Sequence, residues 1–274
     1  MIEPLSAEFP ALTKVQLCRL LGISRSEAYR KGVAKPCSLV KAIELIVTTF
    51  LGYGYRRVHR ALKAQGHTVS QHEVRKAMRE NGLGLRKPRP KSQGITKRDP
   101  LARKYENLLR KYAPTRKGEI WATDMTLIRA ASGACYAAVI LDLYSRKVVA
   151  WHLSRSPDLS LALACLEKAL AKGAPEEGWI HHSDQGSVYT ATEYVAKVRA
   201  AGGRISMSRT ATPTDNAHVE SFFRTLKKEE VMGNRYDSFL ELEASLGRYI
   251  DGNYNALRMH SSLGFLSPDQ YEAQ

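Results

Sequence analysis

The chain has 274 residues, with 42 Lys and Arg against 27 Asp and Glu, which gives a formal net charge of +15 at pH 7. This length exceeds one ordinary domain and predicts a catalytic core with a smaller module attached. No run of eighteen apolar residues and no charged leader followed by an apolar stretch occurs. We therefore expect a soluble intracellular protein without a membrane partner. The four cysteines are too widely spaced for a zinc framework, so structural zinc is not expected.

The positive charge is concentrated in the first part of the chain. Residues 1–118 hold 26 Lys and Arg against 8 Asp and Glu, a net of +18, whereas residues 119–274 hold 16 against 19, a net of −3. This asymmetry predicts a nucleic-acid-binding amino half joined to a nearly neutral catalytic half. The alternative is a basic solvated surface without a ligand.

Residues 1–35 contain the first of two helix-turn-helix patterns. Apolar residues recur at helical spacing, are interrupted at Gly22, and resume after the cap residue Ser24. The second helix would offer Arg25 and Arg30 to a major groove, although a short helical hairpin shows the same pattern.

Residues 36–83 contain the second pattern. A helix near 39–51 is followed by a segment that ends at the turn residue Gly66, and Ser70 and Glu73 form a capping-box motif that starts another helix. We expect this region to bind DNA. The candidate contacts are Arg56, Arg57, His72, Arg75 and Lys76.

Residues 84–117 are predicted to be a basic linker. Its first part, residues 84–100, contains prolines and few apolar residues, which is typical of an extended segment that follows a phosphate backbone. A plain solvated tether is the alternative. The candidate DNA contacts are Arg86, Lys87, Arg89 and Lys91.

Residues 118–234 are predicted to form an α/β catalytic core. Three strands near 119–128, 135–142 and 146–153 come first. A helix from Ser156-Pro157 to Gly173, a strand at 179–182, a helix capped by Thr190 to Glu193, a strand at 204–208 and a last helix follow. This order is typical of a ribonuclease-H-like fold. Residues 235–274 are predicted to be a helical tail that packs on the core.

Three carboxylates lie on separate elements of this core. Asp124 interrupts an apolar strand, where a charge is costly unless it is paired or binds a metal. Asp184 follows a short strand, at the sheet edge where catalytic side chains of α/β proteins lie. Glu220 lies on the last helix, and three such carboxylates are the minimal cage for one or two hard cations. Alternatively, Asp124 pairs with a core arginine, Asp184 caps a turn, and Glu220 pairs with Arg224.

The helix that carries Glu220 also carries polar and cationic residues on the same face. Asn216, Arg224 and Lys227 stand at helical spacing from the carboxylate, and we expect all three to contact DNA. His181 and His182 are not expected to act as a base, because a metal lowers the pKa of its bound water.

The motifs Trp121-Ala-Thr-Asp124, His182-Ser-Asp184-Gln-Gly-Ser and Asp215-Asn-Ala-His-Val-Glu220, with 35 residues between Asp184 and Glu220, resemble those of IS3-family insertion-sequence transposases. The resemblance covers nearly the whole chain. Gln185 departs from it, because family members usually carry a basic residue there, and Thr210-Ala-Thr lacks the usual glycine.

The resemblance implies an integrase-type core in which Asp124, Asp184 and Glu220 hold two Mg²⁺ ions, with Mn²⁺ as a substitute. It further implies cleavage at the 3′ ends of the element and strand transfer. The implied partners are double-stranded DNA of the terminal inverted repeats and target, further copies of this chain, and the product of an upstream reading frame as a fusion. The expected location is the bacterial cytoplasm, at the nucleoid.

Two other functions stay open at this point. The chain can be a DNA-binding regulator of transposition without activity of its own, or a stand-alone metal-dependent nuclease.

Overall fold

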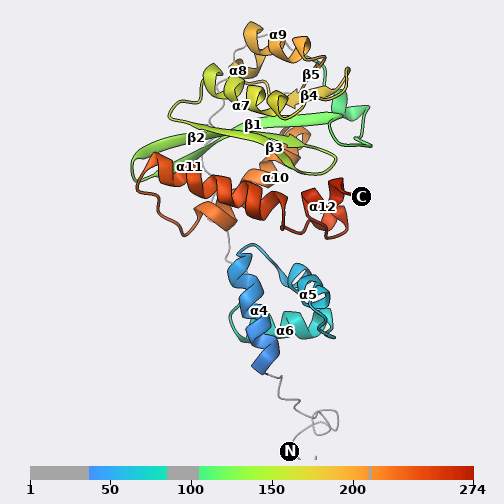
Figure 1. Ribbon diagram of the computed structural model, residues 1–274, viewed down its shortest axis with the longest axis vertical. Coiled ribbons are helices and arrows are strands. Elements are labelled where there is room, and N and C mark those ends of the chain that lie inside the picture. The colour runs from blue at the N-terminus through green and yellow to red at the C-terminus, as the bar shows by residue number, and fades with distance from the viewer. Residues whose placement is uncertain (1–36, 85–104, 210–211) are drawn as a thin grey trace, which may run out of the picture.

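The computed structural model describes residues 37–84, 105–209 and 212–274. The first helix-turn-helix pattern, with Arg25 and Arg30, lies outside the described residues, as do the linker residues Arg86, Lys87, Arg89 and Lys91. In the described part of the chain, no helix is long and apolar enough to cross a membrane. An α/β core and a smaller helical module lie end to end (Figure 1).

The core is built on a five-stranded sheet in the order β3-β2-β1-β4-β5. The antiparallel strands are β1 (Ile120–Ala130), β2 (Gly133–Asp142) and β3 (Val148–Ser154). The shorter strands β4 (Ile180–Ser183) and β5 (Arg204–Met207) extend the sheet in parallel with β1. All five strands were expected from apolar runs and turn residues, and the predicted ribonuclease-H-like order is confirmed.

Helices cover both faces of the sheet (Figure 1). One face carries α7 (Leu159–Ala171), α8 (Ser187–Thr190) and α9 (Thr192–Ala200). The other carries α10 (Ala217–Leu226) and α11 (Phe239–Gly247), and the π-helical segments η3 (Lys227–Val231) and η4 (Arg248–Asn255) continue these two helices. Successive strand residues point to opposite faces, so the sheet separates two apolar clusters.

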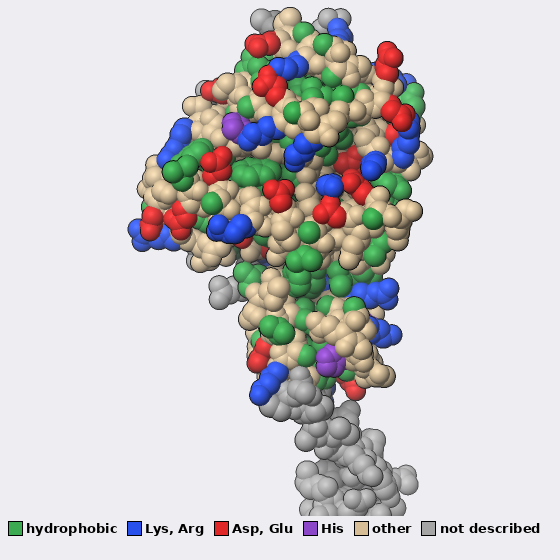
Figure 2. All heavy atoms as spheres, in the orientation of Figure 1, with side chains coloured by type: hydrophobic (Ala, Val, Ile, Leu, Met, Phe, Trp, Pro, Cys, Tyr) green, Lys and Arg blue, Asp and Glu red, His purple; other side chains and the backbone are tan. Residues whose placement is uncertain are grey.

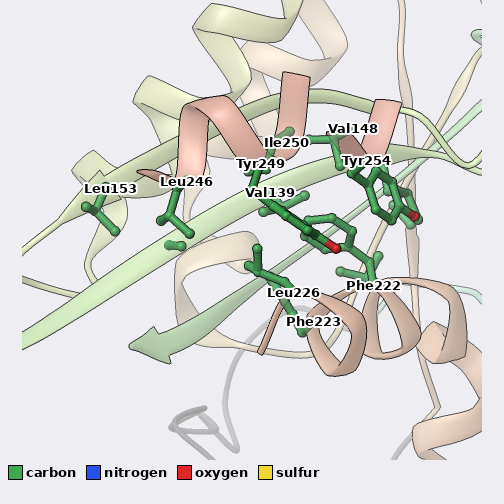
Figure 3. Packing of buried hydrophobic residues seen from close by; sticks show 14 of the residues in the cluster. Val139, Val148, Leu153, Phe222, Phe223, Leu226, Leu246, Tyr249, Ile250 and Tyr254 are labelled. Carbon is green, nitrogen blue, oxygen red and sulfur yellow. The ribbon is translucent and has the colours of Figure 1, made fainter. Parts of the chain in front are cut away.

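The cluster beneath α10 joins the catalytic region to the carboxyl-terminal tail. Phe222 on α10 stacks edge-on against Tyr254 on η4, with ring centroids 4.8 Å apart. Figure 3 shows these rings beside Val148 of β3 and Tyr249 of η4. The tail ends with the short helices η5 (Ser261–Leu263) and α12 (Pro268–Glu272). Burial of these aromatic side chains is the main force that holds the tail on the core.

Two expectations about this core need correction. Thr190 does not cap α9, because it ends the extra turn α8 and its hydroxyl donates to the carbonyl of Ser187 at 3.0 Å. The predicted linker also ends earlier than residue 117. Leu108, in the short helix η1 (Leu108–Arg110), is buried in the core, and its backbone N–H donates to Ser206 Oγ at 2.9 Å. Residues 105–117 therefore pack on the core.

The helical module consists of α4 (Cys37–Thr49), α5 (Tyr55–Ala64) and α6 (Gln71–Glu80). The predicted capping box is confirmed: the Ser70 hydroxyl accepts from the Glu73 N–H at 3.2 Å, and the Glu73 carboxylate accepts from the Ser70 N–H at 2.8 Å. A separate apolar cluster, which includes Ile43, Leu62 and Val74, holds the three helices together.

Candidate active site

Asp124 and Asp184 are placed side by side by the parallel pairing of β1 and β4. Ala122 on β1 lies opposite His182 on β4, so Asp124, two residues further along β1, faces the point where Asp184 leaves the end of β4. The third carboxylate arrives from the helix α10, which packs on β1. The three predicted carboxylates therefore meet at one end of β4.

Asp124 shows the electrostatic effect of this convergence. Its pKa is raised to about 7, mainly by burial and in addition by the negative charges of Asp184 and Glu220. Its Oδ1 accepts a hydrogen bond from the Met125 N–H at 2.7 Å, and the positive charge of Lys227 also opposes the rise in pKa. A carboxyl group with these neighbours would release its proton to solvent if a cation bound beside the three acids.

The other two acids differ in their partners. Asp184 Oδ1 accepts from the Gly186 N–H at 2.9 Å, so the turn-capping role considered as an alternative is present. Glu220 is half-buried, and no hydrogen bond or ion pair is recorded for it within residues 37–84, 105–209 and 212–274. In the same residues no three Asp, Glu, His or Cys side chains form a ready-made metal cage. The carboxylates must therefore move closer together before all three can share an ion.

The polar residues expected on the Glu220 face do not share one environment. Lys227 lies toward the acids, since burial lowers its pKa while the charge of Asp124 raises it. Arg224 is exposed. Asn216 differs from the expected DNA contact, because it is only 6 % exposed and its Nδ2 donates to the Thr123 carbonyl at 3.1 Å. The reason is that residues 213–216 form the 3₁₀ turn η2, so Asn216 precedes the regular helix.

The two histidines on β4 are structural. His181 Nε2 lies 2.8 Å from the Tyr194 hydroxyl, and His182 Nδ1 lies 2.8 Å from Ser206 Oγ. Burial lowers the pKa of His181 to about 3 and that of His182 to about 4. Both rings are therefore neutral at physiological pH, and each places one ring nitrogen against a hydroxyl group inside the core.

Asp142 and Asp215 have structural roles outside the group of three acids. Asp142 accepts from the Gly118 N–H at 2.7 Å and from the Ser145 N–H at 2.8 Å, which closes the β2–β3 turn. Asp215 accepts from the Arg209 side chain at 3.0 Å, and this interaction lowers the pKa of Asp215. The pairing fixes the loop that leads into α10.

A cleft of about 400 Å³ beside the start of α10 was not foreseen. Its lining includes Arg110, Arg146 and His218, which come from three separate segments. The sequence signal at Arg146 was its place in a turn, where it adopts a left-handed backbone with φ of 63°. Such a backbone is uncommon for a residue other than glycine and fixes the direction of the side chain.

In the helical module, the candidate DNA contacts lie on two helices. His72, Arg75 and Lys76 are exposed on α6, and Arg56 is exposed on α5. Arg57 is only half-exposed, and its Nε is buried without a hydrogen-bond partner. The first four residues therefore form an open basic surface, whereas Arg57 faces a neighbouring part of the protein.

Comparison with known proteins agrees with this geometry. The Integrase core domain family matches residues 114–213 and 201–268, and the HTH-like domain family matches residues 39–91. The transposase for insertion sequence element IS904 of Lactococcus lactis is 34% identical over 220 residues, which are 80% of this chain and 87% of that protein. Transposase InsF for insertion sequence IS3A of Escherichia coli is 33% identical over 285 aligned positions, gaps included, which cover 99% of this chain and 96% of that protein. The chain belongs to the IS3 family of transposases.

Membership in this family makes the chain a DNA transposase, an enzyme with an integrase-type polynucleotidyl transferase core. A solved intasome of simian T-cell lymphotropic virus, in complex with a PP2A regulatory subunit, is similar in fold. Its TM-score is 0.50 and its sequence identity 16%, over 85% of this chain and 74% of that chain. The predicted family, fold class and enzyme class are thus confirmed.

Proposed function

We propose that this IS3-family transposase cleaves the 3′ ends of its element and joins them to target DNA at Asp124, Asp184 and Glu220. The observation that carries the proposal is the rise in the pKa of Asp124 to about 7, because burial and the other two acids together cause it. Three carboxylates that repel one another in this way fit hard divalent cations, which prefer oxygen ligands and neutralise the repulsion.

Asp124 lies between the other two acids and is the residue best placed to bridge two ions. Two Mg²⁺ ions, or Mn²⁺ in their place, would activate the attacking hydroxyl and stabilise the leaving oxygen. Asp124 and Asp184 each use Oδ1 for a backbone hydrogen bond, which leaves Oδ2 for an ion. Glu220 then completes the set by a change of side-chain rotamer on α10.

The cationic residues next to the acids hold the DNA. Lys227 lies close enough to Asp124 to affect its pKa, and we assign it to a phosphate beside the scissile bond. The exposed residues of α6, Arg75 and Lys76, are assigned to base edges in a major groove, and Arg56 to the backbone. The substrates are the terminal inverted repeats and the target duplex.

Further copies of the chain and a fused upstream segment belong to the same proposal. Cleavage and joining of two element ends require two active sites, so we infer a homo-oligomer assembled on DNA. The enzyme would act in the bacterial cytoplasm, at the nucleoid.

A strand-transfer assay on labelled element ends tests the proposal. Joined product that depends on Mg²⁺ or Mn²⁺ is the expected result. Binding without any product identifies a regulator of transposition, and hydrolysis without joining identifies a nuclease. Either of these outcomes, obtained also with the upstream segment fused, contradicts the proposal.

A further inference from the structure

The helical module and the carboxyl-terminal tail meet in an interface that neither half contains alone. The Met259 N–H donates to the Tyr53 hydroxyl at 2.8 Å, and the Met259 side chain packs on the apolar cluster of the module. At Gly52 a Cβ atom would lie 1.7 Å from Glu229 Oε1, so the Gly52 backbone lies directly against the Glu229 side chain. We call this interface the seam. Its residues are Gly52, Tyr53, Arg57, Lys228, Glu229, Arg258, Met259 and His260.

The only carboxylate of the seam is already committed. Glu229 accepts three hydrogen bonds from Arg258, at 2.8, 2.9 and 3.1 Å, and a fourth from the Tyr249 hydroxyl at 2.8 Å. Both side chains of the ion pair are 5% exposed. The charge of Glu229 is therefore balanced by Arg258, and Arg57 and Lys228 have no carboxylate of their own within the seam.

Those remaining cations repel one another. Burial lowers the pKa of Arg57, and the positive charge of Arg258 lowers it further. Burial likewise lowers the pKa of Lys228. The negative charge of Glu229 opposes this change, and the positive charges of Arg57 and Arg258 add to it. Arg57 and Lys228 therefore carry charge that the seam does not neutralise.

Two polar atoms of the seam, and one on the β2–β3 turn next to it, are buried without a hydrogen-bond partner. They are Arg57 Nε on α5, Arg146 Nη1 on the β2–β3 turn and His260 Nε2 on the tail. His260 lies within the electrostatic reach of Arg57, Arg146 and Arg258, so these groups surround one region. Buried donors without partners cost about 1–3 kcal/mol each, and a structure with several close together indicates a missing acceptor.

Arg146 extends this region toward α10, the helix that carries Glu220. It lines the 400 Å³ cleft with Arg110 and His218, and His218 lies in the first turn of α10. Asp142 lies near Arg146 but its oxygens accept from the Gly118 and Ser145 N–H groups. The orphaned donors and the cleft together trace a basic path from α5 to α10. Figure 2 shows Lys and Arg side chains along the flank of the module on which α5 lies.

We propose that the seam binds phosphate groups of the DNA backbone, with Arg57 of the module and Arg146 of the core as its donors and His260 between them. This inference rests on the proposed transposase function and adds a contact that requires both halves at once. Arginine suits the role because its planar guanidinium presents several donors to phosphate oxygens. The backbone that crosses the seam then runs toward the cleft at the start of α10. Bound DNA therefore holds the module in one orientation relative to the catalytic core.

The test uses Arg57→Met and Arg146→Met in the full chain, because methionine retains apolar volume and removes the unpaired donors. Lys63→Gln, an exposed position on the same helix, and Arg235→Gln, whose only recorded ion pair is with exposed Asp237, serve as matched controls. Affinity is measured for a duplex of the element's terminal inverted repeat in which single phosphates are replaced by neutral methylphosphonates. Each phosphate in turn is neutralised, first with the parent protein and then with the variants.

The expected result is a short run of phosphates at which the methylphosphonate weakens the parent protein about tenfold but leaves Arg57→Met and Arg146→Met unaffected. The two variants should also lower the slope of log affinity against log salt by about one each. Without DNA, neither variant should melt below the parent protein, because unpaired donors stabilise nothing. The control variants should keep the full sensitivity to methylphosphonates.

Three results would overturn the inference. The variants can stay as sensitive to every methylphosphonate as the parent protein, or they can lower the melting temperature without DNA, which would make the arginines structural. Stabilisation of the parent protein by inorganic phosphate alone, with no methylphosphonate effect, would assign the site to a free anion. Repeating the binding in the Asp124→Asn background separates this result from the proposed function, since that background cannot join DNA.

Discussion

Asp124 combines two properties that a buried carboxylate rarely has together. It is surrounded by other acids, and it lies within electrostatic reach of Lys227. Without a cation this arrangement is destabilising, and with one it becomes the source of binding energy. The residue-scale predictions all follow from that difference.

Asp124→Asn, Asp184→Asn and Glu220→Gln should each abolish nicking and joining, because each removes one metal-binding charge at nearly constant volume. DNA affinity should change by less than about threefold, since the basic module is intact. Turnover and affinity are measured on the same preparations. Near-normal joining with Mg²⁺ by any one variant would show that its residue does not hold the active ion.

The pH dependence of stability should report Asp124 directly. Because its pKa rises from 3.8 to about 7 on folding, the folded chain binds more protons than the unfolded chain between these values. In EDTA, the free energy of unfolding should therefore fall as the pH rises from about 4 to about 7. Asp142, with a pKa that burial also raises, contributes in the same direction.

The difference between the parent protein and Asp124→Asn isolates the contribution of Asp124. Denaturant unfolding of both proteins across this range is the measurement, and parallel curves would contradict the prediction. Mg²⁺ should reverse the trend, with an apparent affinity that increases through the same pH range.

Lys227→Ala should reduce joining of correct ends by about tenfold or more, and reduce cleavage of a nonspecific, pre-melted substrate much less. The reason is that Lys227 lies beside the acids and positions one strand. Arg224→Ala is the matched control, since Arg224 is exposed on the same helix. An equal loss on both substrates would reduce Lys227 to a general electrostatic contact.

At the scale of elements, one continuous helical run carries both a proposed catalytic acid and a structural acid. Glu220 lies on α10, and Glu229 lies on its π-helical continuation η3. Glu229→Gln should lower the free energy of unfolding by about 3–5 kcal/mol, because it leaves Arg258 buried without its counter-charge.

A double variant separates charge from packing at this pair. Glu229→Met together with Arg258→Met should recover most of the loss, since an apolar pair avoids the desolvation of two charges. Asp237→Asn, in the exposed pair with Arg235, should change stability by less than about 0.5 kcal/mol. Chemical denaturation of the three variants decides the prediction, which fails if Glu229→Gln is as mild as the exposed control.

The sequence predicted the elements well where local pattern determines them. Apolar runs bounded by turn residues predicted the strands of the core, and the Ser70 and Glu73 capping box predicted the start of α6. The prediction for Thr190 was wrong because its hydroxyl bonds to the Ser187 carbonyl within the extra turn α8 and does not cap α9. Asn216 was placed on a regular helix, whereas the actual 3₁₀ turn changes its direction.

The three acids of the candidate site could be predicted from the sequence, whereas the ion pair and the unpaired donor near it could not. Asp124, Asp184 and Glu220 stand out because carboxylates after strands and on a nearby helix are unusual and are spaced along the chain. The Glu229–Arg258 pair and the unpaired Arg146 donor have no such signal. They depend on contacts between segments that are distant in sequence, so only the assembled tertiary structure shows them.

At the scale of the whole molecule, the charge asymmetry persists when the boundary is moved to match the structure, although it is smaller than for the division after residue 118. Because residues 105–117 pack on the core, the natural boundary lies before residue 105. Residues 1–104 then hold 22 Lys and Arg against 7 Asp and Glu, a net of +15, and residues 105–274 hold 20 against 20, a net of zero.

Residues 105–274 alone should bind element ends weakly, whereas the full chain should lose about 10³-fold in affinity between 50 and 200 mM salt if it contacts six or more phosphates. The carboxyl fragment contains both apolar clusters of the catalytic core, so circular dichroism first confirms that it is folded. Affinity of the two proteins across the salt range is the measurement. Equal affinity for element ends would refute the prediction that the amino half supplies most of the binding.

The close approach of Gly52 to Glu229 has a mechanical consequence. Nine residue steps, about 14 Å at the α-helical rise, separate Glu220, the proposed catalytic acid, from Glu229, which lies against the module at Gly52. A helix is stiff along its axis, so a displacement of the module at Glu229 would also displace Glu220. Tension on DNA bound to the module would therefore reach the proposed catalytic acid through this helix.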